Sequence, residues 1–130
     1  MDNNNPLQKL IVDETKETNL QELAGVLESY VVFIKSSEAI NLLPKFQKLP
    51  NDLKILVVLA SSKARAMLFS QQSEGMSQKD FISLDIAPEG SIKATLKKLF
   101  DGKEIKSKDK KYYLPSYRIS SLAERLKNIK

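Results

Sequence analysis

The sequence predicts a mainly α fold with a small β-hairpin, and two features of its pattern lead to this fold class. Apolar residues recur every three or four positions through most of the chain after residue 19, which is the spacing of helices that bury one face. Residues 103–114 differ, because they place a lysine-rich turn between two short stretches suited to strands. Apolar residues form 42% of the 130-residue chain, which is enough to build a buried core.

Residues 1–50 are predicted to form an N-terminal extension that is helical or combines a helix with a hairpin. A short helix is expected at residues 7–11, followed by disorder over residues 13–18. A clear helix begins after Asn19, whose side chain can cap it together with Glu22 in a variant of the capping box. The apolar residues of this helix are Leu20, Leu23, Leu27 and either Tyr30 or Val31.

Two structures are compatible with the residues that follow. The helix could continue to about Ile34 and be followed by a second short helix, or a hairpin could pair residues 30–34 with residues 39–43. The first of these stretches is β-branched and aromatic, which suits a strand, so the hairpin is the favoured interpretation.

Residues 51–130 are predicted to form the main domain, which begins with a central helix over residues 52–70. The apolar face of this helix is wide enough to imply burial on more than one side. Its residues are Leu53, Leu56, Val57, Ala60, Ala64, Met67 and Leu68, widened by Ile55, Val58 and Leu59. After a loop, Ser77 and Asp80 form the start signal of a second helix of about two turns.

A third helix over residues 88–101 begins at a proline, and Gly102 is expected just after its C-cap. Strands at residues 103–106 and 111–114 then flank a turn, and an amphipathic helix over residues 116–129 ends the chain. The apolar side of the third helix is Ile92, Leu96, Leu99 and Phe100. The residues that face inward from the last helix are Ile119, Leu122 and Leu126.

The chain contains neither cysteine nor histidine, and this absence excludes several kinds of site. Disulfides and thiolate metal sites cannot form, and the commonest general base is missing. No Gly-rich phosphate loop, metal-ligand cluster or ligand pocket is recognisable, so we expect no enzyme activity, cofactor, metal or small-molecule ligand. The polar residues 1–6 and the absence of a long apolar segment predict a cytoplasmic protein that does not enter membranes.

The net charge of +5 is unevenly distributed along the chain. Residues 1–52 carry a net charge of −3, residues 53–87 carry +1, and residues 88–130 carry +7. A polyanion is the natural partner of such a basic region, although a lysine-rich solubilising surface would have the same composition.

From residue 53 the predicted order is helix, short helix, tight turn, helix, hairpin, helix. Segments 77–84, 90–100, 101–105 and 111–114 carry this order, and through them the chain resembles the winged helix-turn-helix superfamily, in particular small regulators of the prokaryotic and archaeal type. The resemblance implies a protein that binds double-stranded DNA as a transcriptional regulator or nucleoid-type binder, and that acts as a homodimer.

In a winged helix the third helix, residues 88–101, would lie in the major groove, and the hairpin turn, residues 106–111, on the phosphate backbone. Opposite its core face the helix offers Ser91, Lys93, Ala94 and Lys97, with Lys98 at the flank. The hairpin adds Lys106, Lys108, Lys110 and Lys111, and Arg118 is a minor candidate. Lysine can reach phosphates or guanine, serine a phosphate, and alanine a thymine methyl group. Because the helix has no Arg, Asn or Gln, we expect modest sequence specificity.

Other interpretations remain open at this point. The lysines could be an ordinary solvated face, or the domain could be a winged-helix protein–protein interaction module in a larger complex. An RNA-binding winged helix would need exposed aromatic residues for base stacking, and only Tyr112 and Tyr113 are available. The N-terminal extension is expected to form a dimer interface or to pack within the chain, through Leu20, Leu23, Leu27 and Val31.

Overall fold

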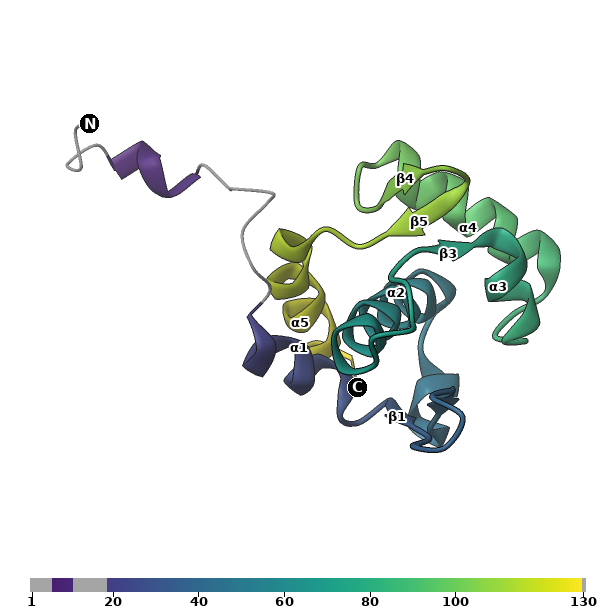
Figure 1. The fold of residues 1–130 in the computed structure, drawn as a ribbon. Helices are drawn as coiled ribbons and strands as arrows, with labels where there is room; N and C mark the ends of the chain where they lie inside the picture. Colours follow the sequence, from purple (N-terminus) through teal and green to yellow (C-terminus); the bar gives the residue numbers. More distant parts are fainter. Residues whose placement is uncertain (1–5, 11–18, 130) are drawn as a thin grey trace.

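Helix α2, Asn51–Leu68, forms the centre of the protein in the computed structural model, which describes residues 6–10 and 19–129. Leu53 and every residue from 55 to 64 are buried. Because α2 is buried on all sides, other elements must pack around it, as its wide apolar face predicts. The helices packed against it are α1 (Leu20–Leu27), α4 (Glu89–Asp101) and α5 (Ile119–Lys127) (Figure 1).

Helix α1 begins where the sequence predicts it to begin. The Asn19 side chain accepts a hydrogen bond from the Glu22 backbone N–H at 3.1 Å, which confirms Asn19 as the N-cap. Only this half of the predicted capping box is seen, and the Glu22 carboxylate accepts from the Ser120 hydroxyl at 2.8 Å. The buried residues of α1 belong to the same core cluster as those of α2. Before it, Pro6–Leu10 form the short 3-10 helix η1, while Ile11 and the predicted disorder over residues 13–18 lie outside the described residues.

A hairpin follows α1, which confirms the favoured interpretation of this segment. Strand β1, Val31–Phe33, pairs antiparallel with β2, Ile40–Leu42, and the 3-10 helix η2, Pro44–Lys48, leads on to α2. The β-branched and aromatic residues of β1 suit this extended backbone. Val31 and Phe46 are buried in the cluster that contains α2, so the N-terminal segment shares its core with the rest of the chain.

A second sheet contains three short antiparallel strands in the order β3–β5–β4. The predicted strand at 103–106 and turn at 107–110 are wrong, because the turn consists only of Asp109 and Lys110, with φ of 53° and 66°. A two-residue turn with both φ values positive matches the twist of paired strands, so the strands extend to the tip. The strands are β3 (Met76–Ser77), β4 (Lys106–Lys108) and β5 (Lys111–Tyr113).

Strand β3 leads directly into helix α3, Gln78–Ser83, and the predicted capping box between them is confirmed. The Ser77 hydroxyl accepts from the Asp80 N–H at 3.2 Å, and the Asp80 carboxylate accepts from the Ser77 N–H at 2.9 Å. A connection in which Asp85 has a φ of 55° then leads to α4, which begins after Pro88 as predicted.

The end of α4 differs from the prediction by one residue. Gly102 is itself the C-cap with a φ of −80°, and Lys103 takes the left-handed conformation with a φ of 60°. A Cβ atom on residue 102 would lie only 3.3 Å from the Lys98 carbonyl oxygen, so glycine allows a close approach here. The 3-10 helix η3, Ser116–Arg118, precedes helix α5. Leu126 of α5, which is predicted to face inward, is only partly buried.

Four apolar side chains predicted to face the core are instead substantially exposed. The exposed fractions are 65% for Leu20, 49% for Met67, 65% for Leu68 and 47% for Phe100. Each of these residues lies in the first or last turn of its helix. The helical spacing is therefore right, but the helices extend beyond the elements that cover them.

Polar side chains on α2 fasten the segments that pass over it. The Ser61 hydroxyl donates to the Val57 carbonyl within α2 at 2.8 Å, whereas the Ser62 hydroxyl donates to the Glu74 carbonyl in the following loop. Lys63 is 6% exposed, and its ammonium lies 2.9 Å from the Glu74 carboxylate and 3.4 Å from the Ser116 hydroxyl. The loop before β3 and helix η3 are thus held by one buried cation.

We predict that Glu74→Gln destabilises the protein more than Lys63→Met does. The first change leaves a buried ammonium without its counter-ion and should cost about 2 kcal/mol, less than in a dry interior because water reaches Glu74. Methionine follows the same apolar path without a charge and should cost less. Urea unfolding measures both free energies, and an equal or greater loss in Lys63→Met would contradict this account.

Candidate nucleic-acid interface

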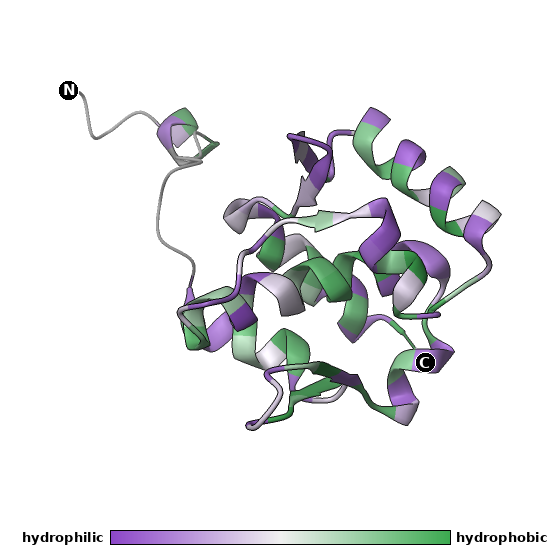
Figure 2. Ribbon diagram, turned by 45° about the vertical axis from the view of Figure 1, so that its right-hand side comes forward, coloured by the Kyte–Doolittle hydropathy of each residue, from purple (hydrophilic) through white to green (hydrophobic). Residues whose placement is uncertain are grey.

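Helix α4 divides into a buried face and an exposed basic face. Ile92, Leu96 and Leu99 are at most 1% exposed and pack toward α2. Hydrophilic and hydrophobic residues alternate along this helix (Figure 2). The residues exposed on its other side include Lys93, Ala94, Lys97 and Lys98, while Ser91 is half-buried.

One of these lysines has an acidic neighbour. The Lys97 ammonium lies 2.9 Å from the Asp101 carboxylate one turn later, and the two side chains are 78% and 59% exposed. A pair this exposed contributes only about 0.3–0.5 kcal/mol and is easily exchanged for another anion. Within the part of the chain that the structure describes, Lys93 and Lys98 form no ion pair.

The hairpin of β4 and β5 sorts its residues onto two faces. Because Lys106 pairs with Tyr113 and Lys108 with Lys111, these four residues share one face of the sheet. Tyr112 is on the opposite face and packs against the core. Six lysines of α4 and of this hairpin are exposed, and we call them the basic surface. They are Lys93, Lys97, Lys98, Lys106, Lys108 and Lys110.

Two predicted site residues are engaged elsewhere. Lys111 is half-buried and lines a cavity together with Arg65 of α2. The Arg118 guanidinium donates to the Lys103 carbonyl at 3.1 Å and lies 5.8 Å from the centre of the Tyr117 ring. Neither residue is part of the basic surface.

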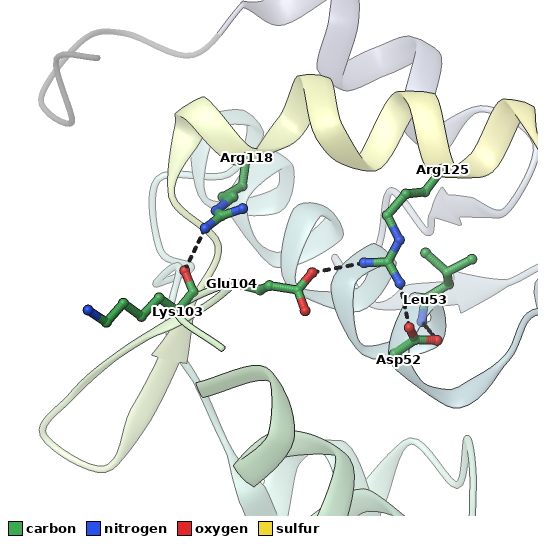
Figure 3. A network of polar contacts seen from close by, with 6 residues as sticks. All are labelled: Asp52, Leu53, Lys103, Glu104, Arg118 and Arg125. Atoms are coloured by element: carbon green, nitrogen blue, oxygen red, sulfur yellow. Dashed lines mark hydrogen bonds and ion pairs between the residues drawn. The ribbon is translucent and has the colours of Figure 1, made fainter. Parts of the chain in front are cut away.

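A polar network fixes the connection between α4 and β4 (Figure 3). Arg125 of α5 bridges the carboxylates of Asp52, at the start of α2, and Glu104, with the latter contact at 2.9 Å. Arg118 holds the neighbouring Lys103 carbonyl. The base of the hairpin is therefore tied to two helices by guanidinium groups whose geometry suits paired acceptors.

Sequence reasoning missed Lys103, which also contributes positive charge here. It is exposed between α4 and β4, and its ammonium points away from the network into solvent (Figure 3). Its place between two predicted groups of lysines was the only available signal. No signal in the sequence indicates the network of Asp52, Glu104 and Arg125, because these three residues are separated by 52 and 21 positions in the chain.

The described residues contain no group of three or more acidic side chains arranged to hold a metal ion. No helix among them has the length and apolar character needed to cross a membrane. Comparisons with protein-family models, curated proteins and solved structures found no match to this chain.

We expect Arg125→Ala to loosen the connection between α4 and β4. The change leaves two partly buried carboxylates without their shared cation, at a cost of about 1 kcal/mol. Hydrogen exchange of the backbone amides of residues 103–105 should therefore become roughly fivefold faster.

The control for this change is Lys127→Ala, because Lys127 pairs with Glu124 at 3.8 Å while both side chains are more than 70% exposed. Exchange at residues 103–105 should not change in that variant. Equal exchange rates in both variants would show that the network does not hold the hairpin.

Proposed function

We propose that the protein binds double-stranded DNA as a winged helix-turn-helix protein, with α4 in the major groove and the β4–β5 hairpin on the phosphate backbone. The order of elements supports this proposal, because α3, a short connection and α4 are followed closely by the hairpin. In proteins that use this motif the second helix enters the groove and the flanking elements contact the backbone.

The observation that carries the proposal is the concentration of positive charge on α4 and the hairpin. Residues 89–111 contain eight lysines but only four acidic residues, and one of these, Glu104, is paired with Arg125. Phosphates would neutralise this excess and release the counter-ions of the duplex, which favours binding at moderate salt.

The chemistry of the exposed face of α4 supports modest sequence specificity. Lys93 and Ala94 are exposed in the first half of the helix, where a groove-binding helix contacts the bases. Lysine can contact guanine and alanine a thymine methyl group, but α4 lacks the Arg, Asn and Gln side chains that read bases with paired hydrogen bonds. A regulator or nucleoid-type binder that acts without catalysis fits these properties.

One observation favours a different function, that of a protein–protein interaction module. Phe100 is 47% exposed on α4, close to the lysines of the basic surface. An aromatic side chain in this position could anchor a partner protein. A single exposed apolar residue is nevertheless common on protein surfaces, so DNA is the better-supported partner.

We expect the variants Lys93→Ala/Lys97→Ala and Lys108→Ala/Lys110→Ala each to weaken binding to random duplex DNA. Each removes two phosphate or base contacts, so the slope of log K against log salt should become shallower by about 2 in each. Fluorescence anisotropy over a range of salt concentrations measures both quantities.

The matched control is Lys35→Ala/Lys48→Ala, which removes the same charge from exposed positions on the β1–β2 hairpin and η2. This variant should bind DNA nearly as the wild type does. Unchanged affinity in both basic-surface variants would favour the interaction module instead.

We also propose that two copies pair through an apolar groove between α1 and the end of α2. The groove has a volume of about 330 Å³, and Leu20, Phe33, Met67 and Leu68 are among the residues that line it. Three of these are the exposed helix-end residues described above. Helix α1, which lines the groove, and helix α4 lie on opposite sides of α2 (Figure 1), so pairing at the groove would leave both basic surfaces free for a duplex.

Leu68→Glu should therefore convert a dimer into a monomer in sedimentation equilibrium, because it places a charge in the apolar groove. Val32→Glu is the control, since Val32 is also exposed but does not line the groove. A wild-type protein that sediments as a monomer at every concentration would refute the dimer.

A further inference from the structure

A second cavity, of about 400 Å³, lies between four parts of the fold. Its walls come from the β1–β2 hairpin, the end of α2, helix α3 with the loop before it, and strand β5. This volume is within the range of cavities that hold small molecules. The cavity is separate from the basic surface, with which it shares no residue.

Two cations line this cavity without acidic partners. The Nε atom of Arg65 is buried and has no hydrogen-bond partner. Among the described residues, neither Arg65 nor Lys111 forms an ion pair. The buried Nε atom itself is closed to the cavity, but neither positive charge is matched by an acidic acceptor among these residues, so the cavity can attract an anion.

The one acidic side chain of the lining does not supply that acceptor. Asp80 uses its carboxylate to accept the Ser77 N–H at 2.9 Å in the capping box. With two cations and one acid, the cavity carries a net positive charge. Ser73 and Ser83 add hydroxyl groups, which can donate further hydrogen bonds to an anion.

The cavity also has an apolar wall. Ile40, Met76 and Leu84 contribute to the lining, and Met76 is only 4% exposed. A mixture of a few convergent polar groups with apolar side chains is typical of sites for small organic molecules. An inorganic ion alone would leave this wall without a contact.

We propose that the cavity binds a small organic anion, whose phosphate or carboxylate group lies between Arg65 and Lys111. A guanidinium group presents parallel N–H donors that match two oxygens of such a group, and the ammonium adds a second charge. The remainder of the molecule packs against the apolar wall. The proposal does not rest on DNA binding, because it is tested with small anions alone.

The test measures the thermal unfolding midpoint of the full chain during titrations with inorganic phosphate, glucose 6-phosphate and citrate. Sodium chloride keeps the ionic strength constant, because phosphate and citrate also stabilise proteins without a site, and that effect does not saturate. A site gives a saturable rise in the midpoint. The variants are Arg65→Gln and Lys111→Gln, so that one remains informative where the other fails to fold.

We expect a saturable rise with glucose 6-phosphate or citrate that is lost in both variants and kept in Lys48→Gln, which removes an exposed charge that does not line the cavity. The anion that saturates at the lower concentration distinguishes a phosphate from a carboxylate ligand. A rise that never saturates, one seen with inorganic phosphate alone, or one that persists in Arg65→Gln and Lys111→Gln, would overturn the proposal.

Discussion

The burial of helix α2 on every side is the constraint on which the rest of the structure depends. From residue 55 to residue 64 no residue is more than 8% exposed, so each neighbouring element must supply a matching surface. The elements that do so come from both ends of the chain, since α1 and α5 pack on α2 and on one another. Lys63 adds a polar requirement, because its buried ammonium keeps Glu74 and Ser116 close to the helix.

This arrangement leaves α4 with one side committed to the core and the other open. The cations on its open side repel one another, and a protein tolerates such repulsion where solvent and salt screen it. What gives the surface a defined shape is the guanidinium network behind it, in which Arg125 and Arg118 hold the connection from α4 to the hairpin. The residues that position the basic surface are thus different from the lysines that give it its charge.

Local signals in the sequence predict the parts of the fold that depend on local interactions. The caps at Asn19 and Ser77 are patterns of four residues; the capping box at Ser77 forms in full, and Asn19 caps its helix through its own side chain. Strand β3 has only two residues and therefore no periodicity to recognise. For the candidate site, helical spacing separates the open face of α4 from its core face, except that Phe100 is exposed and Ser91 is half-buried. It cannot show that Lys111 and Arg65 line the same cavity, because these residues are 46 positions apart in the chain.

The left-handed residues have a consequence for the rigidity of this region. Asp85 precedes α4, Lys103 follows it, and Asp109 and Lys110 form the hairpin tip, whereas no described glycine has a positive φ. The left-handed conformation of a residue with a side chain is about 1 kcal/mol higher in energy than its right-handed conformation. These three bends around one helix therefore keep a less favourable backbone conformation, which the helices and strands that they join hold in place.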